Sequence, residues 1–148
     1  MKHFLFFMVV FISFFFLSNS AGAVCVKVPK ANLRSGPGTK YEKTWHVFKY
    51  FPFKKTGKKG NWYEVEDVDG DVHWIYRKLV TNTFDCAVVK KDIANVRTGP
   101  GTRFETSYFG PAGKYDSFKV LMRQGNWVNV KDEFGNTGWI YRKLLWIY

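Results

Sequence analysis

Apolar and polar residues alternate over short stretches of the chain, as they do in half-buried β-strands. Residues 24–29 alternate in this way, with valines on one face. Residues 62–67 alternate as well, and the turn at residues 69–71 predicts a hairpin whose second strand covers residues 72–76. No stretch keeps a period of 3.6 residues, so the pattern predicts very little helix.

The chain contains the same pattern twice. Residues 32–42 match residues 95–105 at an offset of 63, with seven identities in eleven positions. Later, residues 60–79 match residues 125–144 at an offset of 65, with twelve identities in twenty. The growth in offset predicts a two-residue insertion in the second copy, and composition places it in a loop around residues 110–113. A repeat of this kind decides how the whole fold is interpreted.

The local signals indicate five or six short strands in each copy of about 60 residues, which is typical of a small closed barrel. Sharp turns are expected at the Gly-Pro-Gly sequences of residues 36–38 and 99–101. A core of about 60 residues is marginal alone, so the many large aromatic rings are physically sensible. We therefore expect an all-β chain of two tandem small barrels, over residues 24–80 and 86–148, with a linker at residues 81–85.

These motifs resemble the bacterial SH3 (SH3b) domain family, in its exported tandem form. The family pattern opens with Asn-x-Arg-x-Gly-Pro-Gly, continues to a Gly-x-Trp strand, and closes with Asp-Gly, Gly-Trp-Ile/Val and Leu-Leu. The second copy follows it throughout, whereas the first has His73 in place of the usual Gly and Val80 in place of the final Leu. The resemblance implies SH3-like β-barrels and a binding module of bacterial envelopes, often associated with peptidoglycan or its stem peptides.

Residues 1–23 have the layout of a secretory signal peptide. Lys2 and His3 precede a run at residues 4–17 that is apolar except for one serine, and small residues lead to a predicted cleavage after Ala23. An uncleaved membrane anchor would need about 20 apolar residues. A lipoprotein would use Cys25, but the residues before it lack the usual leucine and small residue. We expect an exported product, periplasmic or at the cell surface, with no transmembrane segment after cleavage.

The formal charge is +11 and falls to +10 when Lys2 is removed. So basic a chain favours polyanionic partners such as acidic envelope polymers, whereas export disfavours nucleic acid. The densest cluster of basic residues is at residues 54–60. Such a cluster is ordinarily the solvated tip of a hairpin. Its functional interpretation is a salt-sensitive contact with an acidic envelope polymer. The candidate basic surface comprises Lys54, Lys55, Lys58, Lys59, Arg77 and Arg142.

Nothing in the sequence supports catalysis. His46 and His73 do not recur between the copies, and no cysteine or histidine spacing fits a zinc site. The chain contains the residues for a Cys–His hydrolase dyad, but no local motif supports one. We therefore expect no enzyme activity, no metal and no cofactor.

Two cysteines remain in the exported chain. Cys25 and Cys86 fall on the face of their strands opposite the valine face, near the starts of the two copies. In an oxidising compartment two such outward-facing thiols could be bridged, which would tie the copies together. Two unpaired thiols are the alternative.

Aromatic side chains are the natural candidates for contact with a peptide or sugar. The tryptophans of the Gly-x-Trp and Gly-Trp-Ile motifs are interpreted as core or supporting residues, and Arg34, Arg97, Asn32 and Asn95 as braces of the turns through backbone carbonyls. The ligand-binding candidates are Tyr41, Trp45, Tyr76, Phe104, Tyr108 and Tyr141.

Three functions are compatible with these features. The first is a cell-envelope module that recognises peptidoglycan stem peptide or glycan. The second is an adaptor that binds an extended or proline-rich peptide of an envelope protein. The third is nonspecific polyanion binding through the basic surface.

Overall fold

The computed structural model describes residues 22–148, whose regular elements are almost all β-strands joined by turns and loops. The predicted signal peptide lies outside the described residues, apart from its last two positions, Gly22 and Ala23, which begin the first strand. Two single-turn 3-10 helices, η1 (Arg77–Leu79) and η2 (Arg142–Leu144), are the helical elements of this part of the chain. None of its helices is long and apolar enough to cross a membrane.

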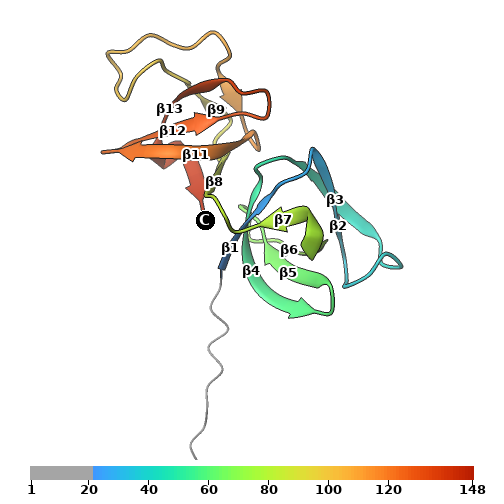
Figure 1. Cartoon of the computed structure of the whole chain (residues 1–148). Helices are drawn as coiled ribbons and strands as arrows, with labels where there is room; N and C mark the ends of the chain where they lie inside the picture. The colour runs from blue at the N-terminus through green and yellow to red at the C-terminus, as the bar shows by residue number, and fades with distance from the viewer. Residues whose placement is uncertain (1–21) are drawn as a thin grey trace, which may run out of the picture.

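The first copy forms one antiparallel sheet of seven strands, in the order β3-β2-β6-β5-β4-β1-β7 (Figure 1). We call this part copy one. Its strands are β1 (Gly22–Val26), β2 (Lys30–Arg34), β3 (Lys43–Phe48), β4 (Pro52–Lys59), β5 (Trp62–Glu66), β6 (Val72–Tyr76) and β7 (Val80–Thr81). The predicted hairpin is β5–β6: β6 has the predicted bounds, and β5 ends at Glu66, one residue before the end of the alternating stretch.

The second copy, here copy two, forms a five-stranded antiparallel sheet in the order β13-β12-β11-β8-β14 and a separate β10-β9 pair. Its strands are β8 (Cys86–Val89), β9 (Ile93–Ala94), β10 (Ala112–Gly113), β11 (Ser117–Gln124), β12 (Trp127–Lys131), β13 (Thr137–Tyr141) and β14 (Leu145–Ile147). Figure 1 shows it as the yellow-to-red part of the chain.

The all-β class and the antiparallel sheets are confirmed, but two closed barrels are not. Over residues 22–148, no strand pairing joins β3 to β7 or β13 to β14, so neither sheet closes on itself. Register shifts at 55/57 in β4 and at 120/122 in β11 mark β-bulges at equivalent positions. A bulge bends its strand and increases the local twist, so each sheet curves without closing. The domain boundaries stay predictions. Thr81, which the sequence assigned to the linker, lies in β7 and pairs with Cys25 of β1.

Each copy has a hydrophobic core built mainly from the inward faces of equivalent strands, and Val88 of β8 joins the core of copy one. Val65 and Ile75 of copy one correspond to Val130 and Ile140 of copy two, and all four are fully buried. The cores differ at His73, which is buried on the inward face of β6. Its counterpart Gly138 has no room for a side chain, because the side chains of Val96 and Phe109 occupy that space. A ring therefore lies at this place in each copy, supplied by His73 of β6 in copy one and by the loop residue Phe109 in copy two.

The Gly-Pro-Gly turns are braced as the sequence predicts for the two arginines. The Arg34 guanidinium donates to the carbonyls of Thr39 and Tyr41, at 3.0 and 2.8 Å. Arg97 donates to the corresponding carbonyls of Thr102 and Phe104, at 3.2 and 2.9 Å. Within the described residues, neither Asn32 nor Asn95 makes a side-chain hydrogen bond of this kind.

A Gly99→Ala substitution should destabilise copy two by about 1–3 kcal/mol, because the added methyl would overlap the Phe104 ring. Gly101→Ala is the matched control, since its methyl would lie 3.5 Å from the same ring, in ordinary contact. We expect Gly101→Ala to change stability by less than about 0.5 kcal/mol. Urea denaturation of the two variants measures the difference, and equal midpoints would contradict the packing role of Phe104.

A disulfide joins the copies. Cys25 and Cys86 are bonded, with Cα atoms 6.0 Å apart. Their side chains point away from both cores, as the strand pattern indicates, but they are not exposed to solvent. Both are buried in a small third cluster with Tyr50 and the half-buried Phe84. The outward faces of the two first strands therefore cover each other.

Candidate functional site

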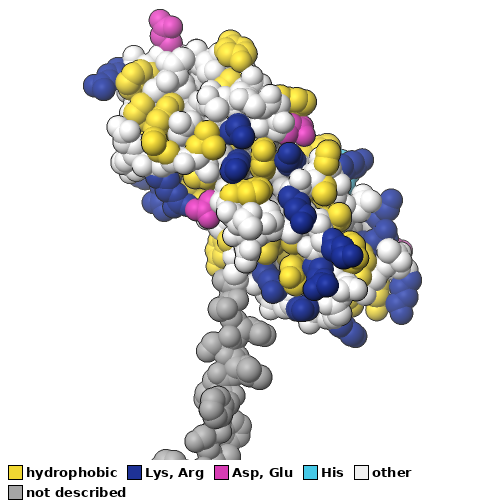
Figure 2. All heavy atoms as spheres, in the orientation of Figure 1, with side chains coloured by type: hydrophobic (Ala, Val, Ile, Leu, Met, Phe, Trp, Pro, Cys, Tyr) yellow, Lys and Arg dark blue, Asp and Glu magenta, His cyan; other side chains and the backbone are white. Residues whose placement is uncertain are grey.

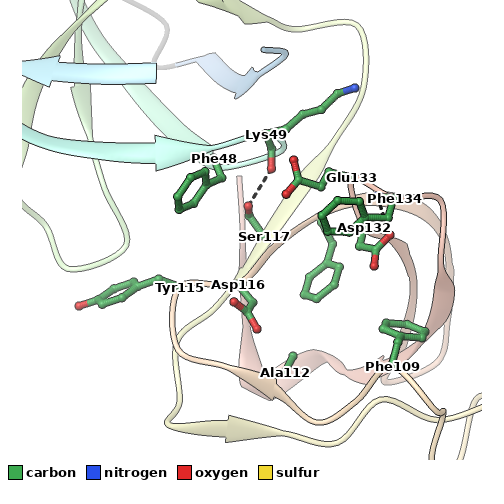
Figure 3. Close-up of a pocket in the computed structure, with 11 residues that line it drawn as sticks. Phe48, Lys49, Phe109, Ala112, Tyr115, Asp116, Ser117, Asp132, Glu133 and Phe134 are labelled. Atoms are coloured by element: carbon green, nitrogen blue, oxygen red, sulfur yellow. Dashed lines mark hydrogen bonds between the residues drawn. The ribbon is translucent and has the colours of Figure 1, made fainter. Parts of the chain in front are cut away.

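Two cavities lie where the copies meet, and Tyr115 lines both of them. We call the two together the junction site. The aromatic cleft, of about 220 Å³, takes residues from both copies and is drawn in Figure 3. The His73 cleft, of about 310 Å³, lies over copy one and includes Trp45. A hollow between domains with a few converging polar groups is where ligand sites are usually found.

Tyr115 stands between the two cavities in a conformation that tyrosine seldom adopts. Its φ is 72°, in the left-handed region, and its repeat counterpart Tyr50 has φ 70°. The Tyr115 ring packs edge-on against Trp45 of copy one, with centroids 5.2 Å apart. Its hydroxyl donates to Asp69 Oδ2 at 2.6 Å, and this hydrogen bond raises the pKa of Tyr115 above its usual value. The phenol therefore stays protonated and links the copies at neutral pH.

Rings from both copies form the walls of the aromatic cleft. Phe48 comes from the end of β3, and Phe109, Tyr115 and Phe134 come from loops of copy two (Figure 3). Phe48 and Phe134 remain 53% and 82% exposed, so a large part of each ring is open to solvent. The Ser117 hydroxyl donates to the Lys49 carbonyl at 2.8 Å and fixes the copies beside the cleft. Exposed rings beside a cavity indicate a surface for a partly apolar ligand.

Acidic residues are concentrated at the junction site. Half of the 12 acidic residues of the chain, six in all, line its two cavities. They are Asp67, Asp69 and Asp71 in the His73 cleft, and Asp116, Asp132 and Glu133 in the aromatic cleft. This is a local excess of negative charge on a chain whose net charge is +11.

Two of these carboxylates hold turns rather than face a ligand. Asp67 Oδ1 accepts the backbone N–H groups of Asp69 and Asp71, each at 2.9 Å, and its Oδ2 lies 3.0 Å from His73 Nε2. Asp132 Oδ1 accepts the N–H groups of Phe134 and Asn136 in the equivalent turn. Carboxylate oxygens of residues 67, 69 and 71 lie within 4.8 Å of one another, a spacing that a cation could use, but those of Asp67 already have partners.

The six aromatic candidates from the sequence do not form one site. Trp45 lines the His73 cleft, and the exposed Tyr108 donates to Asn136, in the turn beside the aromatic cleft, at 2.8 Å. The rings of Tyr41 and Phe104 instead lie over the first glycine of each Gly-Pro-Gly turn. The other two pair across strands with the Gly-x-Trp tryptophans, at centroid distances of 5.6 Å: Trp62–Tyr76 and Trp127–Tyr141.

The candidate basic surface belongs mainly to copy one. Lys54, Lys55, Lys58 and Lys59 all lie on β4, and the N–H of Arg77 bonds to Asn61 in the turn that follows β4. Figure 2 shows Lys and Arg side chains spread over copy one. Arg142 takes the equivalent position in copy two, through its bond to Asn126.

The sequence interpretation did not select Tyr115, Phe48 or Phe134. One signal was available, because Tyr115 follows Tyr50 at the offset of 65 that aligns the hairpins. The two tyrosines share a backbone conformation but have different neighbours, since Tyr50 packs beside the disulfide. The exposed rings carry no such signal in a single sequence.

Comparison with known families accounts for this architecture. A model described as "Bacterial SH3 domain" matches residues 27–82, and a second model of the same description matches residues 92–145. The chain belongs to the bacterial SH3 domain family. Each copy is one such domain, and the junction site lies between the two SH3 domains.

The chain spans about a quarter of the length of the curated relative that it matches. The chain is 24% identical over 141 residues to the Bacillus subtilis (strain 168) protein named "Putative N-acetylmuramoyl-L-alanine amidase YrvJ". The match covers 88% of this chain but 27% of that protein's length. Among solved structures, an NlpC/P60 family protein from Bacillus cereus aligns with a TM-score of 0.40 at 12% identity, covering 86% of this chain and 56% of that one. "Endolysin LysPBC5 CBD" aligns with a TM-score of 0.35 at 20% identity, covering 86% and 93%.

Proposed function

We propose that this chain is an exported cell-envelope binding protein that attaches to peptidoglycan through the junction site and has no catalytic activity. The observation that supports this most is that two tandem bacterial SH3 domains account for most of the described chain. The curated relative is named for N-acetylmuramoyl-L-alanine, a unit of peptidoglycan, and this chain matches only about a quarter of it. A segment of that size is compatible with an ancillary binding region.

The chemistry of the junction site supports a peptidoglycan ligand. Peptidoglycan offers short peptides and sugar rings, and both can lie against exposed aromatic side chains. Phe48 and Phe134 supply such rings from opposite copies. The carboxylates at the margin of the aromatic cleft supply acceptors for N–H and O–H donors. Because both copies line the cleft, we expect one peptide to contact both SH3 domains at once.

Sedimentation with purified peptidoglycan tests the proposal. The folded protein should pellet with the polymer at low salt and retain saturable binding at about 0.15 M salt. Absence of pelleting at low salt, with folding verified by circular dichroism, would overturn it. Recovery of a single cross-linked envelope protein, without pelleting, would favour the adaptor function instead.

A Phe134→Ala substitution should weaken peptidoglycan binding by about tenfold. Exposed aromatic anchors of a binding site commonly contribute about 1 kcal/mol or more to affinity. The ring is 82% exposed, so its removal should change the unfolding free energy by less than about 0.5 kcal/mol. Met122→Ala is a matched control, since Met122 is an exposed apolar residue that does not line either cavity. Equal affinities for both variants and the original chain would exclude Phe134 from the binding surface.

Polyanion binding is a second candidate function, and the scarcity of ion pairs among the described residues favours it. Among residues 22–148, Arg123 is the one lysine or arginine that lies within ion-pair distance of a carboxylate, 3.2 Å from Asp85. Apart from Arg34 and Arg97, which brace the Gly-Pro-Gly turns, the other basic side chains of this part of the chain are available to an acidic polymer. Such binding should fall steeply with salt and should not saturate at a defined stoichiometry.

A further inference from the structure

The aromatic cleft differs in charge from the rest of this basic protein. Of the charged residues that line it, three are acidic, Asp116, Asp132 and Glu133, and one is basic, Lys49. The neighbouring His73 cleft adds three more carboxylates and no lysine or arginine. A site with aromatic walls and an acidic margin complements a positive charge attached to an apolar stem.

We infer that the aromatic cleft binds the free primary amine of an un-cross-linked peptidoglycan peptide. This inference rests on the proposed function and specifies which chemical group of the polymer the site recognises. An ammonium on a short aliphatic chain would place its methylenes between Phe48 and Phe134. Its charge would then reach the carboxylates of Asp116 and Glu133.

The carboxylates have room for this contact. Within residues 22–148 the carboxylate of Glu133 makes no hydrogen bond or ion pair, and Asp116 uses only its Oδ2, which accepts the N–H of Gly113 at 2.8 Å. Asp132, by contrast, is occupied by its own turn. Two of the three acidic groups in the cleft are therefore free to accept from an ammonium.

Lys49, which lines the aromatic cleft, and Lys114, which precedes Tyr115, leave these acceptors available. The ammonium of Lys49 lies 5.2 Å from the centre of the Tyr50 ring, and that of Lys114 lies 5.1 Å from the centre of the Tyr115 ring. Neither lies within ion-pair distance of a carboxylate. The contact between Lys114 and Tyr115 also shows that a ring of this site accommodates an ammonium group.

The amine of the ligand explains how a basic protein can select one part of an anionic polymer. The surrounding lysines attract the polymer without regard to position. The junction site adds a local preference for the positive group, which cross-linking or acetylation would remove. Recognition of un-cross-linked peptide then depends on the cleft and not on net charge.

The test compares purified peptidoglycan sacculi that carry free diamino-acid amines with the same sacculi after acetylation by acetic anhydride. We expect acetylation to weaken binding of the chain at least tenfold. Acetylation also makes the polymer more negative, so a protein held by its basic surface would bind the treated sacculi equally or more tightly. Equal or tighter binding to acetylated sacculi would overturn the inference and leave the proposed function in place. Absence of binding to untreated sacculi would overturn both.

A pair of double variants locates the effect in the cleft. D116N/E133Q removes two negative charges from the aromatic cleft, and the amide introduced at position 116 keeps an oxygen for the Gly113 N–H. E42Q/E105Q removes two from the exposed Gly-Pro-Gly loops, which line neither cavity. We expect D116N/E133Q to bind untreated sacculi about tenfold more weakly than E42Q/E105Q, and the two to be equal on acetylated sacculi. Equal binding to untreated sacculi would overturn the assignment to this cleft.

Discussion

Reduction of the Cys25–Cys86 disulfide should lower the free energy of unfolding by about 4 kcal/mol. The bond links residues 61 positions apart, so it closes a long loop in the unfolded chain. Removing that constraint returns the corresponding conformational entropy to the unfolded state, which chain-entropy reasoning values at roughly 4 kcal/mol for such a loop. Each SH3 domain has only a small core, so this is a large share of the total stability.

Urea denaturation with and without a phosphine reductant measures the effect of the disulfide. The double substitution C25A/C86A is the control, because it removes the bond without adding a reductant. It should unfold near the midpoint of the reduced chain, slightly lower because two buried side chains become smaller. A loss of less than about 1 kcal/mol in both experiments would show that the unfolded chain is already restricted without the bond.

Much of the fold was predictable because it depends on local chemistry repeated in sequence. Glycine and proline fix the turns, alternation fixes which face of β5 or β12 is buried, and Arg34 finds its carbonyl partners within seven residues. The repeat then doubles the signal, since each element is observed twice. These features need no knowledge of how the two copies are oriented.

The junction site was not predictable from the sequence, because it depends on contacts between residues that are far apart in the chain. The contacts of Tyr115 with Trp45 and Asp69 join residues 70 and 46 positions apart, and they exist only because the copies meet at one particular face. Tyr50 and Tyr115 have the same local sequence signal, yet one packs beside the disulfide and the other against the opposite domain. The closure of the barrels is not confirmed, because the number of strands does not reveal which edge strands pair.

An Asp67→Ala substitution should destabilise copy one by about 3 kcal/mol. All the hydrogen-bond partners of Asp67 lie within copy one. Asp67 is 3% exposed. Its carboxylate accepts the N–H groups of Asp69 and Asp71 and forms a hydrogen bond with His73 Nε2. Alanine would leave the buried His73 nitrogen without that partner and would free the turn between β5 and β6. Loss of hydrogen bonds to a buried charged group typically costs about 1.5–3 kcal/mol each, with partial recovery by water in the turn.

The substitution Asp67→Asn separates the two roles of this residue. An asparagine oxygen can still accept the turn N–H groups, so only the contact with His73 changes, and His73 keeps its bond to Thr44 Oγ1 at 2.8 Å. We expect Asp67→Asn to lose less than half of what Asp67→Ala loses, as measured by urea denaturation. Equal losses would mean that the pair with His73, and not the turn, carries the stability. Since Asp69 and Asp71 lie in this turn and line the His73 cleft, Asp67→Ala should also disorder one wall of the junction site, whereas Asp67→Asn should preserve it.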